Sequence, residues 1–518
     1  MSTSLHDSIE AANTPPRASR REWIGLAVIA LPCLLYSMDL TVLHLAVPQL
    51  SKDLEPTSAE LLWIIDIYGF LVAGSLITMG TLGDRIGRRR LLLIGAGAFG
   101  IASVIAAYSR SAEMLIASRA VLGVAGATVA PSTLSLIRNM FLHPQQRTVA
   151  ISVWIMSFSL GGAIGPLIGG LLLQSFWWGS VFLISVPVMV LLLIVGPRLL
   201  PEYRDPSPGK PDPVSAGMSL AAVLLVIFGL KQIAQDGISP WPVATIVAGV
   251  AIGIAFGRRQ LRLDTPLVDL RLFREPGFSA SLATYGLAIL VTFGGFLFLP
   301  QYLQLVLGLS PFVAGLWTLP WALAFIVGAS ITPPLIRRWH PSSIMSAGLV
   351  LSGVGFAMLA TVGRGTSFAW FAIATGLLAI GVAPAFTLTT DLIIGTAPPE
   401  RAGAASAISE TSAELGGALG IALFGSIGVA IYRTAMAARI PGTLTPDGAE
   451  AARSTLGGAL VSAAQLPADQ GQVLIDAGRS AFLSALQLCS VISLAGSLVL
   501  AVFVVMTLRH VKRAEAVG

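Results

Sequence analysis

Charged residues are scarce in this sequence: they make up 11% of the 518 residues, whereas 55% are hydrophobic. A soluble globular protein of this length carries about a quarter charged residues to cover its surface. The chain instead contains repeated apolar runs of about 20 residues, the length of a transmembrane helix. It lacks the alternating pattern of an outer-membrane barrel. These features predict an all-α polytopic membrane protein.

Cysteine is nearly absent as well, since the chain has only Cys33 and Cys489, each within an apolar run. Two such residues offer neither a disulfide framework nor a metal cluster at ligand spacing. The sequence also has no P-loop, no metal-ligand set and no nucleophile with a suitable base. We therefore expect no enzymatic activity, no metal site, no bound cofactor and no ATP-driven transport.

The apolar runs indicate fourteen spans, of which the first begins at Trp23. With the amino terminus placed inside, the cytoplasmic segments hold 23 Lys and Arg residues and the outer segments hold 8, counting Lys231 among the outer ones. Cytoplasmic loops typically carry this excess, so we expect both termini in the cytoplasm and an even number of spans. The net charge of +6 then requires no nucleic-acid partner.

Five ionisable residues lie inside the predicted spans, where an unpaired charge costs several kcal/mol. Asp39, Asp66 and Arg119 fall at similar depth, which predicts an ion-pair cluster that would respond to protonation. Glu410 and Glu414 are four residues apart and share one helical face, where repulsion and burial favour protonation of one carboxylate. A proton carrier or a cation site needs a carboxyl group that can gain and lose a proton in this way. The alternative is a structural role, in which Asp39 and Arg119 lock helices together, or, for Asp66 near the outer boundary, simple hydration. The glutamate pair lacks a partner that would lock helices.

A glycine-rich basic turn with the sequence GTLGDRIGRRR follows the second span at residues 80–90. Its glycines permit close helix approach, and Asp84 can hold basic partners near a helix end. An ordinary cytoplasmic loop explains the arginines but not the embedded aspartate. The run resembles a signature of the major facilitator superfamily, a latch between helices on the cytoplasmic side. The resemblance implies a conformational role for Gly80, Gly83, Asp84, Arg85, Gly87 and Arg88.

Two further motifs lie in the fourth and fifth spans. The fourth contains Arg119 in an R-x-x-x-G-x-x-G pattern, which in the same superfamily is linked to proton coupling. The fifth contains GGAIGPLIGG at residues 161–170, with small residues on one face that allow close helix packing. This run resembles the antiporter motif that marks exporters of the superfamily. The resemblance implies a conformational role for Gly161, Gly165, Pro166, Gly169 and Gly170.

The first two spans narrow the resemblance to one family of exporters. MDLTVLHLAVP at 38–48 is similar to the signature of the fourteen-span drug:proton antiporters, and WIIDIY at 63–68 resembles exporters of quaternary ammonium compounds. Unlike some of these exporters, the chain has no acidic residue at 319–327 in the tenth span, so transport of divalent cations is not implied. The resemblance assigns proton coupling to Asp39, Arg119, Asp66, Glu410 and Glu414, and substrate binding to Asp66, Glu410 and Glu414.

The resemblance also implies a domain organisation of two six-helix bundles with two additional helices between them. The expected segments are a disordered cytoplasmic tail at 1–22, a bundle at 23–197, a proline-rich cytoplasmic linker at 198–213, two inserted helices at 214–257, a bundle at 258–508 and a cytoplasmic tail at 509–518. Residues 433–479 would form a long extracellular connection that is too polar to span. This connection is either an amphipathic hairpin or an ordinary loop.

The implied function is that of a proton-coupled antiporter that exports lipophilic, mainly cationic drugs and antiseptics by alternating access. Its partners would be small lipophilic cations, protons and the lipid bilayer. The energy source would be the proton gradient across a bacterial cytoplasmic membrane, and the protein would work as a monomer. The alternative is an exporter dedicated to one antibiotic or endogenous metabolite on the same scaffold.

Overall fold

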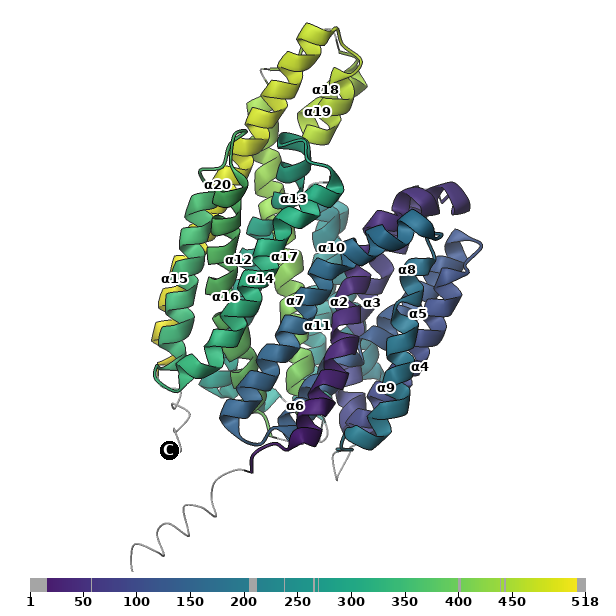
Figure 1. The fold of residues 1–518 in the computed structure, drawn as a ribbon, viewed down its shortest axis with the longest axis vertical. Helices are drawn as coiled ribbons and strands as arrows, with labels where there is room; N and C mark the ends of the chain where they lie inside the picture. The colour runs from purple at the N-terminus through teal and green to yellow at the C-terminus, as the bar shows by residue number, and fades with distance from the viewer. Residues whose placement is uncertain are drawn as a thin grey trace, which may run out of the picture.

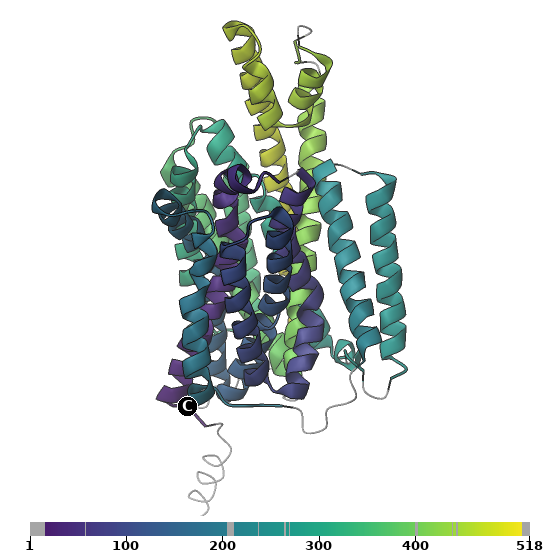
Figure 2. The ribbon, with the colours of Figure 1, turned by 90° about the vertical axis from the view of Figure 1, so that its right-hand side faces the viewer.

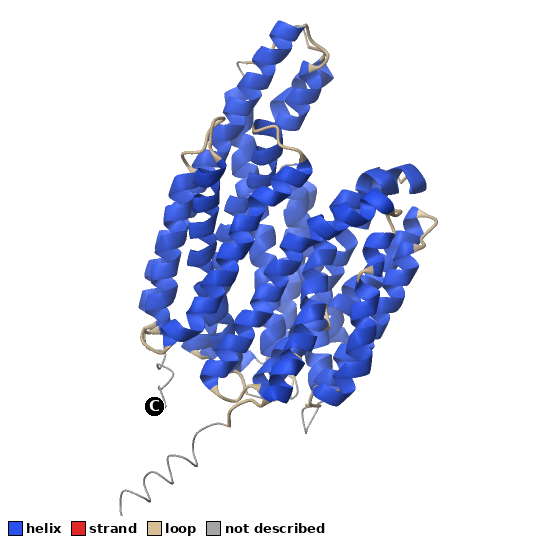
Figure 3. Cartoon of the chain, viewed as in Figure 1, coloured by secondary structure: helices blue, strands red, loops and turns tan. Residues whose placement is uncertain are grey.

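The computed structural model describes residues 16–56, 58–204, 212–236, 238–263, 266–268, 270–398, 402–437, 439–441 and 444–509. Within these residues the chain is helical and contains no strand (Figure 3). Fourteen helical segments are long and apolar enough to cross a membrane, which confirms the predicted all-α polytopic fold. Residues 1–15 of the predicted tail at 1–22, residues 510–518 of the predicted tail at 509–518 and residues 205–211 of the predicted linker at 198–213 lie outside the described residues.

The first six spans are built from eight helices (Figure 1). Helix α2 packs against α7, and α4 packs against both α5 and α9. The fourth predicted span is divided, because α5 ends at Gly126 and α6 begins at Val129. The helices are α2 (Arg20–Leu54), α3 (Ser58–Ile86), α4 (Arg88–Ala107), α5 (Ala112–Gly126), α6 (Val129–Met140), α7 (Pro144–Ser175), α8 (Ser180–Leu183) and α9 (Ser185–Leu199).

The last six spans follow a short 3-10 helix, η1 (Leu270–Arg274). The ninth span ends in a π-helical turn, η2, directly after a proline-containing turn. The elements are α12 (Pro276–Phe296), α13 (Leu299–Gln301), η2 (Tyr302–Val306), α14 (Pro311–Ile336), α15 (Pro341–Leu359), α16 (Phe368–Thr396), α17 (Ala402–Met436), α18 (Pro446–Ser454), α19 (Leu456–Ala463) and α20 (Ala468–Leu508).

The two ends of the molecule differ. The start of α2 and the end of α20 lie at the same end, which we call the terminus end (Figure 1). At the opposite end, the hairpin end, α17 and α20 project beyond the other helices, and α18 and α19 pack beside them. Residues 433–479, expected as either a hairpin or a loop, are therefore mostly helical. Buried side chains such as Tyr432, Leu456 and Leu474 form the core of this extension.

The inserted pair consists of α10 (Pro213–Asp236) and α11 (Pro240–Gln260). The pair stands at one side of the molecule, with α11 outermost (Figure 2). Helix α10 packs against both α3 and α17, where Val223 and Ile227 meet Phe70, Ala73 and Leu415. Because α3 belongs to the first six spans and α17 to the last six, α10 touches both sets of helices.

Candidate functional site

Asp39 and Arg119 form a buried ion pair between α2 and α5. The Nη1 atom of Arg119 lies 3.3 Å from Oδ2 of Asp39, and the two side chains are 1% and 10% exposed. The guanidinium group also lies over the ring of Tyr68, 5.2 Å from its centroid. A buried ion pair of this kind is strongly coupled, since loss of either charge leaves the other uncompensated. Protonation of Asp39 would therefore alter how α2 and α5 hold together.

Tyr68 links this pair to the second acidic group. Its hydroxyl donates to the carbonyl oxygen of Tyr36 over 3.4 Å, and its ring lies within electrostatic range of Asp39, Arg119 and Glu414. The local packing is close, because a Cβ atom on Gly123 would lie 2.6 Å from the Tyr68 carbonyl oxygen. The glycines of the R-x-x-x-G-x-x-G pattern thus bring α5 against α3 beside Tyr68.

Asp66 does not join the cluster expected from its depth. Its Oδ1 atom instead accepts from Nζ of Lys231 on α10 over 2.6 Å, whereas the described partner of Arg119 is Asp39. The predicted arrangement of one arginine between two carboxylates is therefore wrong. The tally of basic residues had placed Lys231 in an outer segment, and a lysine near the end of a span gives no sign of its partner. Only the packing of α10 against α3 reveals this pair.

Glu410 and Glu414 lie one turn apart on α17, as their spacing predicts. Both are partly accessible, and Oε1 of Glu410 is buried without a described hydrogen-bond partner. The carboxyl group of Glu414 interacts with the hydroxyl group of Tyr36 and lies within electrostatic range of Lys231. A carboxyl group without a partner is costly in an apolar interior unless it binds a proton or a cation. The Oε1 atom of Glu410 is buried and has no described partner, so this carboxyl group is suited to hold a proton or a cation.

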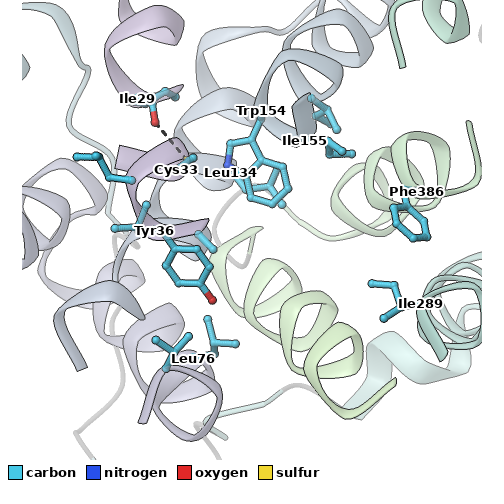
Figure 4. Close-up of a cluster of buried hydrophobic side chains, with 14 of the residues drawn as sticks. Ile29, Cys33, Tyr36, Leu76, Leu134, Trp154, Ile155, Ile289 and Phe386 are labelled. Atoms are coloured by element: carbon cyan, nitrogen blue, oxygen red, sulfur yellow. Dashed lines mark hydrogen bonds between the residues drawn. The ribbon is translucent and has the colours of Figure 1, made fainter. Parts of the chain in front are cut away.

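Tyrosines from both sets of helices, Tyr36 of α2 and Tyr285 of α12, lie within electrostatic range of these carboxyl groups. Tyr36 and Trp154 come from the first set, and Phe386 comes from the second set, with α17 between them (Figure 4). Phe158 contacts both Tyr36 and Trp154, with ring centroids 5.5 Å and 4.7 Å away. Tyr285 packs edge-on against Phe386 at 5.7 Å. Aromatic faces next to carboxylates are a suitable environment for an organic cation.

The motif at 80–90 joins the two sets of helices at the terminus end. Asp84 and Arg88 form an ion pair, and the fully buried Arg88 side chain contacts Gly403 of α17. A Cβ atom on Gly80 would lie 2.6 Å from Cβ of Ala407, so a larger residue would separate α3 from α17. Gly83 also lies against Arg88. Gly87 adopts a positive φ of 110° in the turn between α3 and α4. Arg85 is partly exposed in the last turn of α3.

Sequence reasoning missed several residues at this end. Asp391 of α16 accepts from Nε of Arg147 over 2.8 Å and from the hydroxyl of Thr148 over 2.7 Å. Arg138 of α6 donates to the carbonyl oxygens of Ile394 and Ala397. These contacts tie the first set of helices to the last set at the terminus end. Their only sequence signal is charge near the ends of spans, which is shared with ordinary interfacial residues.

Glu202 is a further missed residue, located in the expected linker. Its carboxylate accepts from the backbone nitrogens of Arg89 and Arg90 over 3.1 and 3.2 Å, at the first turn of α4. The first turn of a helix has unpaired N–H groups and attracts a carboxylate. Glu202 therefore fixes the start of α4 and, with it, the turn that carries Gly87.

The glycines of α7 bring this helix against α2, which carries Asp39. A Cβ atom on Gly161 would lie 2.9 Å from the carbonyl carbon of Leu34, and one on Gly165 would lie 3.0 Å from Cγ of Met38. Gly169 is buried, whereas a Cβ atom on Gly170 would meet nothing within 4 Å. The side chain of Pro166 lies outside what the structure describes.

Because Gly161 packs tightly and Gly170 does not, substitutions at these two glycines should have different effects on stability. We expect Gly161→Ala to lower the thermal stability of the purified protein, because the new methyl group overlaps the Leu34 backbone and overpacking costs about 1–3 kcal/mol. Gly170→Ala is the matched control and should leave the unfolding temperature unchanged or slightly raised. An equal loss of stability in both variants would contradict the assigned packing.

Among the described residues, no group of three or more His, Cys, Asp or Glu side chains is placed to hold a metal ion. Away from the terminus end, the described ionisable groups of the site include two ion pairs, Asp39–Arg119 and Asp66–Lys231, and the two glutamates of α17. Carboxyl groups are the side chains that accept protons, and together with aromatic faces they attract organic cations.

Comparison with known proteins agrees with the motifs. The model of the Major Facilitator Superfamily matches residues 29–421. The multidrug efflux pump LfrA of Mycolicibacterium smegmatis is 43% identical, over 95% of this chain and 97% of that protein. The methyl viologen resistance protein SmvA of Salmonella typhimurium is 38% identical, over 89% and 93%. The tetracenomycin C resistance and export protein of Streptomyces glaucescens is 31% identical, over 98% and 96%.

The fold has a solved counterpart in the human organic anion transporter MFSD10 (TETRAN). The two structures align with a TM-score of 0.60 at 16% identity, over 95% of this chain and 100% of that one. The relatives are transporters, which confirms the prediction that the protein is not an enzyme. The family model covers most of the helices of this chain, and the three relatives are more than 30% identical to it over most of their own length. The chain therefore belongs to the Major Facilitator Superfamily.

Proposed function

We propose that the protein is a proton-coupled exporter of lipophilic, mainly cationic compounds. The observation that carries the proposal is the buried Glu410 oxygen without a described partner, one turn from Glu414 and within electrostatic range of Tyr36 and Tyr285, which belong to different sets of helices. A cation that leaves water needs a carboxylate, and a lipophilic one needs aromatic or apolar faces. The names of LfrA and SmvA, a multidrug efflux pump and a methyl viologen resistance protein, support this substrate class.

The terminus end is the cytoplasmic face in this proposal, as the distribution of basic residues suggests. The ties made by Arg88, Arg138, Arg147 and Asp391 then hold the cytoplasmic side closed. Release of a substrate outward and entry of protons from outside fit a conformation closed on this side. Opening of the cytoplasmic side requires these ties to break. The membrane in this proposal is the cytoplasmic membrane of a bacterium.

Coupling would follow from competition between protons and substrate for the same interior charges. Protonation of Glu410 or Glu414 removes the negative charge that holds the cation, so the cation leaves toward the outside. Protonation of Asp39 weakens its attraction to Arg119 and alters the contact between α2 and α5. Tyr68 contacts Arg119 and lies within electrostatic range of Glu414, so it connects the Asp39–Arg119 pair to the acidic residues of α17. No bound cofactor takes part, since the proton gradient is the energy source.

Transport by the purified protein tests the proposal. In proteoliposomes we expect ethidium to move against its gradient when a pH gradient is imposed, and to stop moving when a protonophore collapses that gradient. Empty liposomes are the control. Ethidium movement that is the same with and without the pH gradient would contradict proton coupling.

A dedicated exporter of one natural product is the second candidate. It is favoured by the 31% identity with the tetracenomycin C resistance and export protein over nearly the full length of both chains. The same proteoliposomes separate the two candidates. A dedicated exporter would ignore ethidium and other unrelated cations, whereas a multidrug exporter would transport several of them.

A further inference from the structure

Lys231 is the interior cation that the mechanism above does not use. The chain has four lysines, and Lys231 is the one whose side chain the structure describes. It is located five residues before the end of α10, and its side chain is 34% exposed. A lysine within a membrane-spanning helix is stable when it is paired or faces water, and Lys231 is both paired with Asp66 and partly exposed.

The surroundings of Lys231 are those of a site for an organic cation. The ammonium group lies 2.6 Å from Oδ1 of Asp66 and 4.6 Å from the centroid of the Phe70 ring. Trp63 and Phe228 pack against Phe70, each with ring centroids 6.3 Å away. A carboxylate together with an aromatic face attracts ammonium groups of ligands and of lysines by the same physics.

Lys231 also lies between the two sets of helices. Asp66 belongs to α3, and Glu414, within electrostatic range of Lys231, belongs to α17. Helix α10 packs on both of these helices, through Val223 and Ile227. The inserted helix therefore brings one positive charge to carboxylates that come from both sets of helices.

We propose that Lys231 is a tethered cation that occupies the Asp66 part of the substrate site and limits the positive charge of the substrates that the site accepts. Asp66, Glu410 and Glu414 together carry up to three negative charges, and Lys231 cancels one of them. A monovalent organic cation can bind at the glutamates while Lys231 stays on Asp66. A divalent organic cation must either displace Lys231 or bind beside it against its repulsion.

This inference rests on the proposed function in one respect, namely that the substrate cation binds at Glu410 and Glu414; the extension of that site to Asp66 is part of the inference. The alternative is a purely structural pair that fixes α10 to α3. The chain offers a matched pair for comparison, because Arg259 of α11 binds Asp212 over 3.1 Å at the other end of the inserted helices. A substitution at Arg259 removes an ion pair of the inserted helices and leaves the Asp66–Lys231 pair in place.

The test is equilibrium binding to the purified full-length protein in detergent, with ethidium as the monovalent probe and methyl viologen as the divalent probe. We expect Lys231→Met, which keeps the length of the apolar stem, to raise the affinity for methyl viologen about tenfold and that for ethidium by a much smaller factor. Lys231→Arg keeps the charge and should behave like the wild type. Arg259→Met should leave both affinities unchanged.

Unfolding temperatures measured for every variant separate a structural role from a role in specificity. If Lys231→Met only lowers stability and leaves the ratio of the two affinities unchanged, the inference is overturned and the proposed function still stands. If neither the wild type nor Lys231→Met binds either cation, both are overturned. Should Lys231→Met fail to fold, Lys231→Gln allows the same comparison.

Discussion

Asp39→Ala is expected to abolish pH-driven transport of ethidium and to destabilise the protein. The substitution leaves the guanidinium of Arg119 buried and unpaired, with a side chain that is 1% exposed. Removal of one partner of a buried ion pair costs about 3–5 kcal/mol, because the remaining charge has lost both water and its counterion. Transport stops for a second reason, since no proton can be exchanged at this pair. Unfolding in detergent and transport in proteoliposomes measure the two effects separately.

The double variant Asp39→Ala with Arg119→Ala separates coupling from structure. Both charges are then absent, so we expect the free energy of unfolding to recover relative to either single variant while pH-driven transport stays lost. Recovery of transport together with stability would mean that the pair only holds α2 and α5 together. Asp476→Ala is the control, because its pair with Arg364 is exposed at the hairpin end and such pairs contribute about 0–1 kcal/mol.

The sequence predicts the number of spans and the interior positions of Asp39, Asp66, Arg119, Glu410 and Glu414, but not that of Lys231, because the cost of polar groups in a bilayer is evident only within a clear apolar run. An apolar run of about 20 residues and a carboxylate within it are local features. Glu410 and Glu414 share a face of α17 because four residues make about one helical turn, whatever the rest of the chain does.

The sequence does not predict which of those charges pair, because the partners lie on helices that are distant in the chain. Depth alone groups Asp66 with Asp39 and Arg119, but depth says nothing about rotation around the helix or about which helix packs beside it. Helix α10 lies next to α3 through side chains 150 residues apart in the chain, and this contact gives Asp66 its partner Lys231. Asp391 escapes prediction for a similar reason, since a carboxylate at the end of a span is as common at a membrane interface as in an ion pair between helices.

Glu410→Gln is expected to reduce ethidium binding by more than tenfold while the binding of a neutral lipophilic compound such as chloramphenicol changes little. Glutamine keeps the size of the side chain and removes its charge, so only electrostatic attraction to the substrate is lost. Loss of one partner of a desolvated charge pair costs about 2–5 kcal/mol, and 1.4 kcal/mol corresponds to tenfold in affinity. Equal loss for the cation and the neutral compound would show that Glu410 supports the fold and does not recognise charge.

The same substitution at Glu414 should have the smaller effect. Glu414 already interacts with the Tyr36 hydroxyl group and feels the charge of Lys231, whereas an oxygen of Glu410 has no described partner. Part of the attraction that Glu414 could offer a substrate is therefore used within the protein. Glu450→Gln is the matched control, since this carboxylate binds Arg433 at the hairpin end and is 52% exposed. A larger loss of ethidium binding for Glu414→Gln than for Glu410→Gln would place the cation nearer Tyr36 and α10 than the free oxygen of Glu410 indicates.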